Sequence, residues 1–257
     1  MCFDLDSHPP IAPIAGGALD STRVELTADD GNRFAAFRAR AAKPAGAAIL
    51  VLPDVRGLHP YYEELALRFA EHGVDALAID YFGRTAGAKA RNETFDYKPH
   101  VEATKWSGLQ ADIRAGVAHL GSVDGRPGAS LFTVGFCFGG RLAFLSATLG
   151  LGLAGVIGFY GRPLGPHASG QPAPADVAGS MRGGVLGLFG GADPGIPTTD
   201  VAAFEAALTA VGVDHRIVSY EGAPHSFFDR KAADFADASA AAWAEITGFI
   251  KARVGPG

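Results

Sequence analysis

The sequence predicts an α/β protein with a mostly parallel, twisted sheet, helices on both faces and an antiparallel pair of strands at the N-terminal edge. Short apolar runs alternate with amphipathic stretches along most of the chain, and this alternation is typical of strands separated by helices. The runs are largely apolar, as expected for strands of a parallel sheet that is covered on both faces. With 257 residues, 48% of them hydrophobic and 19% charged, the chain can bury a large core.

The N-terminal part is expected to differ from the rest of the chain. We predict an irregular arm over residues 1–20, because Pro9, Pro10 and Pro13 interrupt any regular structure there. Residues 21–257 show no internal repeat or linker and are predicted to form a single domain.

The arm is followed by two alternating segments, Thr22–Leu26 and Arg33–Arg40, which we expect to pair as an antiparallel hairpin through a turn at Asp30–Asn32. Largely apolar strands are then expected at Ala47–Leu52, Val74–Ile79, Leu131–Phe136, Ala154–Tyr160, Val185–Phe189 and His215–Tyr220. Helices are expected at Tyr61–His72, Val101–Leu120, Gly139–Leu149, Thr199–Val211 and Ala232–Val254. The segment Arg162–Gly184 is rich in Pro and Gly, so we expect it to be irregular and to overhang the site.

The charge and composition exclude several classes of partner. A net charge of −5 and the absence of a Lys/Arg run argue against nucleic acid and anionic membranes, and the apolar runs are too short to span a bilayer. The two cysteines, Cys2 and Cys137, lie far apart in the sequence and indicate no disulfide framework. The first residues lack a signal pattern, so we expect a cytoplasmic protein that acts on a small molecule. The oligomeric state is left open.

The most informative stretch is Gly135-Phe136-Cys137-Phe138-Gly139-Gly140. It matches G-x-nucleophile-x-G, in which the nucleophile sits on a sharp turn between a strand and a helix. Gly135 and Gly139 would remove side chains that clash with this turn, and the following helix would point its positive end at Cys137. Cys137 is therefore a candidate nucleophile. The alternative interpretation is a buried structural cysteine in a Gly-rich turn.

A cysteine nucleophile requires a base and a residue that orients the base. Asp193 directly follows the predicted strand Val185–Phe189, and His225 follows His215–Tyr220, so both are expected at the carboxyl edge of the sheet. Their order after the nucleophile, acid before histidine, fits this type of site. Alternatively, Asp193 is only a turn or helix-capping residue. His59 is the one other histidine expected in an active-site loop.

These motifs resemble those of the dienelactone hydrolase family, the cysteine-using branch of the α/β-hydrolases. The resemblance runs from about Ala47 to the last helix. It rests on Gly-Phe-Cys-Phe-Gly-Gly, the Gly-Ala-Asp-Pro loop, His-Ser-Phe-Phe and the early segment Leu-Pro-Asp-Val-Arg-Gly-Leu. It implies an α/β-hydrolase fold and hydrolysis of a lactone or ester.

The resemblance also implies roles for residues around the nucleophile. Asp54 stands where the family has a glutamate that contacts the thiol, although a simpler interpretation is a carboxylate bound by nearby backbone amides. The oxyanion would be bound by the N–H groups of Phe138 and Val55. Tyr160 matches a pocket-lining position and is otherwise a core aromatic residue at the end of a strand.

The resemblance further implies that arginines bind a carboxylate of the substrate. Arg84 matches the first of these positions. At the second position, four residues after His225, this chain has Asp229, with Arg230 one place later. This difference weakens any assignment of the family's namesake substrate. Arg141 lies one helical turn after Cys137 and is expected to be structural.

The sequence thus predicts an enzyme that opens an enol lactone or activated ester through Cys137, His225 and Asp193, with a thioester intermediate and no metal or organic cofactor. One alternative is a general carboxylesterase of the same fold. Another is a protein without catalytic activity that binds a ligand or responds to oxidation through Cys137.

Overall fold

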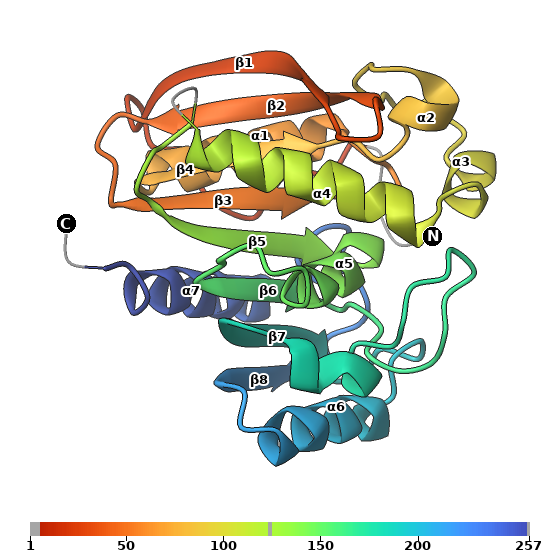
Figure 1. The fold of residues 1–257 in the computed structure, drawn as a ribbon. Helices are drawn as coiled ribbons and strands as arrows, with labels where there is room; N and C mark the ends of the chain where they lie inside the picture. Colours follow the sequence, from red (N-terminus) through yellow and green to blue (C-terminus); the bar gives the residue numbers. More distant parts are fainter. Residues whose placement is uncertain (1–5, 123–124, 256–257) are drawn as a thin grey trace.

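A computed structural model describes residues 6–122 and 125–255 of the chain. All eight of its strands belong to one sheet with the order β1-β2-β4-β3-β5-β6-β7-β8 (Figure 1). The six strands from β4 to β8 are parallel, and β2 and β1 run antiparallel at the edge. The predicted mixed sheet with an antiparallel N-terminal edge is therefore confirmed.

The strands closely match the predicted runs. They are β1 (Ala18–Thr27), β2 (Arg33–Ala41), β3 (Ala47–Leu52), β4 (Val74–Ile79), β5 (Ser130–Phe136), β6 (Gly155–Phe159), β7 (Gly184–Gly190) and β8 (His215–Tyr220). Strand β1 begins before the predicted end of the irregular arm, because Ala18 and Asp20 already pair with Ala41 and Arg40 of β2. Cys2 lies outside the described residues.

The helices differ from the prediction in three places. They are α1 (Pro60–Glu71), α2 (Gly83–Ala86), α3 (Lys98–Glu102), α4 (Trp106–Gly121), α5 (Phe138–Ser146), α6 (Thr198–Ala210) and α7 (Ala236–Lys251), together with the 3₁₀ helix η1 (Ala175–Ser180). The predicted helix Val101–Leu120 is interrupted at residues 103–105, where the extended backbone of Lys105 begins α4. Helix α2 and η1 were not predicted, since each is too short to show a helical period.

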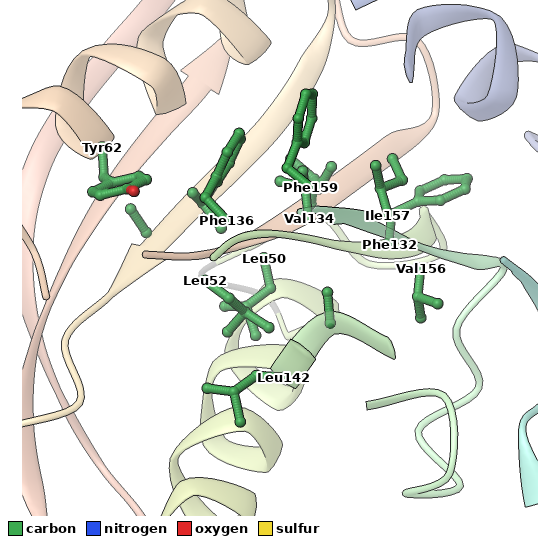
Figure 2. Packing of buried hydrophobic residues seen from close by; sticks show 14 of the residues in the cluster. Leu50, Leu52, Tyr62, Phe132, Val134, Phe136, Leu142, Val156, Ile157 and Phe159 are labelled. Atoms are coloured by element: carbon green, nitrogen blue, oxygen red, sulfur yellow. The ribbon is translucent and has the colours of Figure 1, made fainter. Parts of the chain in front are cut away.

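The core lies on both faces of the parallel strands (Figure 2). Side chains of β5 and β6, including Phe136 and Phe159, pack on one face, beneath α1 and α7 (Figure 2). Leu50, Leu52 and Leu142 lie on the opposite face, which α4, α5 and α6 cover. The central strands β3 and β7 are buried along their whole length because helices exclude water from both faces, whereas the edge strand β8 is only partly buried.

None of the helices in the described part of the chain is long and apolar enough to cross a membrane.

Candidate active site

Cys137 lies at the sharp turn between β5 and α5. Its backbone has φ 55° and ψ −110°, and it is the N-cap residue of α5. A Cβ atom on Gly135 would lie 1.9 Å from the carbonyl oxygen of Gly139, and a Cβ atom on Gly139 would lie 2.1 Å from that of Leu52. Both contacts are impossible for a larger residue, so the glycines are required for the turn, as predicted.

His225 and Asp193 form a hydrogen-bonded pair beside this turn. The Nδ1 atom of His225 lies 2.6 Å from Oδ2 of Asp193, whose side chain is 3% exposed. The other carboxylate oxygen of Asp193 accepts a 2.8 Å hydrogen bond from the N–H of Gly195. A carboxylate bound at both oxygens can hold the imidazole in one orientation, and the role of Asp193 in orienting a catalytic base stays a prediction.

Main-chain hydrogen bonds join the loops that carry this pair. The N–H of Gly191 donates to the carbonyl of Tyr220 at 2.7 Å, and that of Ala192 donates to the carbonyl of Ala223 at 2.9 Å. These bonds connect the turn after β7 to the turn after β8, so Asp193 and His225 are positioned by backbone as well as by side-chain contacts.

One cavity of about 610 Å³ brings most of the predicted site residues together. Its lining includes Cys137, Asp193, His225, Val55, Phe138 and Tyr160. They come from the carboxyl ends of β3, β5, β6, β7 and β8, which meet at one edge of the parallel sheet. The segment Arg162–Gly184, which was predicted to overhang the site, contributes Arg162, Pro166 and His167 to this lining. No role was predicted for the other lining residues, namely Val101, Pro194, Gly195, Ile196 and Pro224.

Tyr160 is buried beside the histidine of the site. Its ring centroid lies 4.8 Å from that of His225, and its side chain is one of the walls of the cavity. Burial raises the pKa of its phenol well above the ordinary value, so the ring stays uncharged at any physiological pH.

Backbone strain is concentrated in this region. Among the described residues, the non-glycine residues with positive φ are Cys137, Tyr160 and Ser226, which is the residue after His225. Each such conformation costs about 1–3 kcal/mol and persists only where the surrounding structure enforces it. Its occurrence at three neighbouring turns supports a functional role for the cavity.

Asp54 is engaged by Arg56 in the same loop. The Oδ1 atom of Asp54 accepts hydrogen bonds from the backbone N–H of Arg56 at 2.9 Å and from its Nε at 3.1 Å, and Oδ2 lies 3.0 Å from Nη2. Within the described chain these contacts occupy both carboxylate oxygens. The predicted contact with the thiol of Cys137 is not among them, and this role of Asp54 stays a prediction.

Arg56 also forms a buried ion pair with Asp229, which lies four residues after His225. Its guanidinium donates to the hydroxyl of Ser7 at 3.3 Å and lies over the rings of Tyr61 and Tyr62. A single buried cation thus connects the loop that carries Val55 to the loop that carries His225. Arg56 lies in the segment Leu-Pro-Asp-Val-Arg-Gly-Leu, but no role was predicted for it from the sequence.

His59 follows in the same loop but does not line the cavity of Cys137. It is 2% exposed, and its Nδ1 accepts the N–H of Tyr61 as the N-cap of α1. Burial and the neighbouring Arg56 lower its pKa to about 4. His59 therefore remains uncharged near neutral pH and has a structural function.

The structure does not bring Arg84 into the cavity of Cys137. Its guanidinium is paired with Asp112 at 2.5 Å and with Asp30 at 2.5 Å, and it lines a separate cavity of about 210 Å³. The pocket that contains Cys137 is instead lined by Arg141, Arg162 and Arg230. A carboxylate-binding role for Arg84 is not supported by this placement.

The pairing of Arg84 leads to a pH-dependent prediction. Burial raises the pKa of Asp112 to about 6, against the opposing effects of Arg84 and Asn32. The folded protein therefore binds the proton of the Asp112 carboxyl more tightly than the unfolded chain does, because an aspartate in an unfolded chain has a pKa of about 3.9. The contribution of Asp112 to the free energy of unfolding should therefore fall by about 2 kcal/mol as the pH rises from about 4 to about 6 and should level off above that range.

This dependence can be measured by urea unfolding between these pH values. The pKa of Asp229 is also raised to about 6 by burial, so it adds a second contribution of the same sign. We expect Asp112→Asn to remove about half of the slope, and Asp229→Asn serves as the matched variant for the other half. A slope that Asp112→Asn leaves unchanged would show that Asp112 is ionised throughout.

The chain is similar to known proteins along most of its length. A model described as the dienelactone hydrolase family matches residues 34–254. A protein of Methylorubrum extorquens, provisionally named carboxymethylenebutenolidase, is 30% identical over 220 residues, which are 84% of this chain and 75% of the relative. A protein of Salmonella typhimurium with the same provisional name is 28% identical over 224 residues, covering 86% and 80% of the two chains.

The chain is also similar to a solved structure. A crystal structure of a protein from Klebsiella pneumoniae, provisionally named dienelactone hydrolase, superposes with a TM-score of 0.73 at 26% identity and covers 90% of this chain and 98% of that one.

Proposed function

Because this chain belongs to the dienelactone hydrolase family of hydrolases, we propose that it opens an enol lactone or an activated ester with Cys137 as the nucleophile. The observation that carries the proposal is that Cys137, strained at φ 55° at the start of α5, shares one cavity with the His225–Asp193 pair. This combination of a nucleophile, a base and a residue that orients the base is the requirement for covalent catalysis.

The first half of the reaction forms a thioester. A free cysteine has a pKa of about 8.5, so near neutral pH a base must remove the proton of the thiol before the sulfur can act as a nucleophile. His225, oriented by Asp193, accepts the thiol proton, and the sulfur attacks the substrate carbonyl. The N–H groups of Phe138 and Val55, two residues that line the cavity, stabilise the resulting oxyanion in this mechanism. The alcohol or enol leaves with the proton from His225.

The second half releases the acid. His225 removes a proton from a water molecule, which attacks the thioester, and the thiol of Cys137 is regenerated. A thiolate is itself a good leaving group, so an amine would be expelled from an amide less readily than the sulfur. We therefore expect turnover of activated esters and enol lactones but not of simple peptides.

A general carboxylesterase is the second candidate, and the placement of Arg84 favours it. The family's carboxylate-binding position is occupied here by a guanidinium that is paired with Asp112 and Asp30 outside the cavity. If the substrate carries a carboxylate, Arg162 and Arg230 are the arginines at the cavity that could bind it, since the guanidinium of Arg141 binds carbonyls.

The two candidates are separated by steady-state kinetics of Arg84→Ala and Arg230→Ala on a dienelactone and on a p-nitrophenyl ester. We expect Arg84→Ala to change KM for either substrate by less than about twofold. For a lactone hydrolase, Arg230→Ala should raise KM for the carboxylate-bearing lactone by about tenfold, as expected for loss of a charge-assisted hydrogen bond. A large rise with Arg84→Ala would restore the carboxylate-binding role of Arg84, and turnover of the ester alone would favour the carboxylesterase.

A further inference from the structure

The connection from β6 to β7 forms one side of the cavity. Its residues 161–174 extend beyond the carboxyl ends of the strands as a long loop (Figure 1). The two limbs of this loop close where the N–H of Ala175 donates to the carbonyl of Pro163 at 3.1 Å. A further bond, from the N–H of Trp106 to the carbonyl of Ser169 at 2.8 Å, attaches its tip to α4. We call residues 162–172 the wall loop.

The centre of the wall loop is filled by the guanidinium of Arg141. On one limb it donates to the carbonyls of Arg162 at 3.0 Å, Leu164 at 3.3 Å and Gly165 at 2.7 Å. On the other limb it donates to those of Gln171 at 3.5 Å and Pro172 at 2.7 Å. One side chain therefore joins both limbs of the loop to α5, the helix that begins at Cys137.

Arg141 has no acidic partner among its hydrogen bonds in the described chain, which all run to main-chain carbonyls. Its side chain is 3% exposed, and burial, followed by the charge of Arg162, lowers its pKa to about 10. A buried guanidinium that binds only carbonyls is costly unless the loop that supplies them is held closed. The position of the loop and the burial of Arg141 thus depend on each other.

The backbone of the wall loop begins in direct contact with α5. A Cβ atom on Gly161 would lie 2.3 Å from the carbonyl carbon of Gly140 and 2.4 Å from the nitrogen of Arg141. Only a glycine allows this approach, which places the start of the loop within one helical turn of the nucleophile.

The inner side of the wall loop carries His167. Its ring lies 5.6 Å from that of Phe138, and its Nδ1 accepts the N–H of Ser169 at 3.2 Å. Burial, followed by Arg141 and Arg162, lowers its pKa, so the imidazole is uncharged near neutral pH and carries its proton on Nε2. His167 and Pro166 line the same cavity as Cys137. At Pro166 and His167 the loop therefore presents an uncharged surface to whatever occupies that cavity, while Arg162 at the start of the loop adds a positive charge to the lining.

We propose that Arg141 is a positioning residue that sets the substrate preference of this site, because it holds the wall loop and His167 against the substrate. The inference rests on the proposed function and adds to it a determinant of substrate size. Arg141 does not touch the reacting atoms. It fixes the surface against which a longer acyl or aryl group packs, while a small acyl group has little contact with that surface.

The test is a comparison of p-nitrophenyl acetate with p-nitrophenyl hexanoate, using wild type and Arg141→Met. We expect the ratio of kcat/KM for the hexanoate to that for the acetate to fall about tenfold in the variant, mainly through a higher KM for the hexanoate. This corresponds to losing the burial of roughly two methylene groups. The matched control is Arg182→Met, which removes an arginine that binds the carbonyls of Gly179 and Met181 at the far end of the same connection. Its ratio should stay within about twofold of wild type.

A second variant and a second measurement distinguish this positioning role from a general loss of folding or catalysis. His167→Ala leaves Arg141 in place and should lower the same ratio about threefold. The rate of alkylation of Cys137 by iodoacetamide should be similar in wild type and both variants. Equal losses for both esters, a ratio that neither variant changes, or slower alkylation in Arg141→Met would overturn the proposal. Failure of the proposed function would look different, since wild type itself would then turn over neither ester.

Discussion

Replacing Cys137 by alanine is expected to lower kcat for any ester or lactone substrate by at least about 10³-fold, because among the described residues that line the cavity only Cys137 carries a thiol. The substitution should affect the chemical step and leave folding and substrate binding unchanged. Cys137 is a half-buried residue at a turn whose backbone is fixed by its glycine neighbours, so the variant should fold and bind substrate. The measurement is steady-state hydrolysis of a p-nitrophenyl ester and a dienelactone, with circular dichroism to confirm folding.

The matched control is Cys2→Ala, which changes the other cysteine of the chain. It should retain full activity. If Cys137→Ala kept more than about a tenth of the wild-type rate, the nucleophile would have to be another residue or an activated water. If both variants were fully active, the cysteine chemistry proposed here would be wrong.

The second large effect is expected on stability, from Arg56→Met. The side chains of Arg56, Asp54 and Asp229 are each at most 4% exposed, so the variant leaves two carboxylates buried without their cation. Breaking a buried ion pair on one side typically costs about 3–5 kcal/mol. We expect a loss of that size in the free energy of unfolding, measured with urea at pH 7.5. Catalytic activity should fall as well, since Arg56 joins the loops of Val55 and His225.

Two further variants test whether this loss of stability comes from the buried ion pairs of Arg56. Arg56→Met combined with Asp229→Asn should recover part of the stability, because one of the unpaired charges is then removed. Arg216→Met breaks an ion pair with Glu245 in which Arg216 is 62% exposed, and it should cost less than about 1 kcal/mol. A loss with Arg56→Met as small as that of Arg216→Met would show that water reaches the cluster.

The parallel strands could be predicted from the sequence because most of them are short, largely apolar runs. Val74–Ile79, for example, is found as predicted, with all six residues buried. The predicted helix Val101–Leu120 is less accurate, because hydrophobic spacing continues across the break at residues 103–105. That break depends on a contact distant in sequence, the bond from Trp106 to Ser169.

The turn at Cys137 could also be predicted from the sequence, since its glycines and nucleophile are all within one short motif. Interactions between residues that are distant in the sequence could not be predicted. Arg56 and Asp229 are separated by 173 residues, and only the fold brings them together. Likewise, Arg84 fits a family position in the sequence, yet its charge is neutralised by Asp30 and Asp112 from other parts of the chain. Sequence motifs identify residue types at a site, whereas charge pairing is decided by tertiary structure.

The most direct test of the central claim is the detection of an acyl-enzyme on Cys137. His225→Ala, which should slow hydrolysis of the thioester, is mixed with excess p-nitrophenyl acetate at about pH 9, where a free thiol ionises without a base. The mixture is then quenched in acid and digested for mass spectrometry. Our account predicts that the peptide containing Cys137 gains the mass of one acetyl group, and that no such adduct forms in the variant that also carries Cys137→Ala. Acetylation of a different residue, or rapid wild-type turnover with no covalent adduct in either variant, would contradict it.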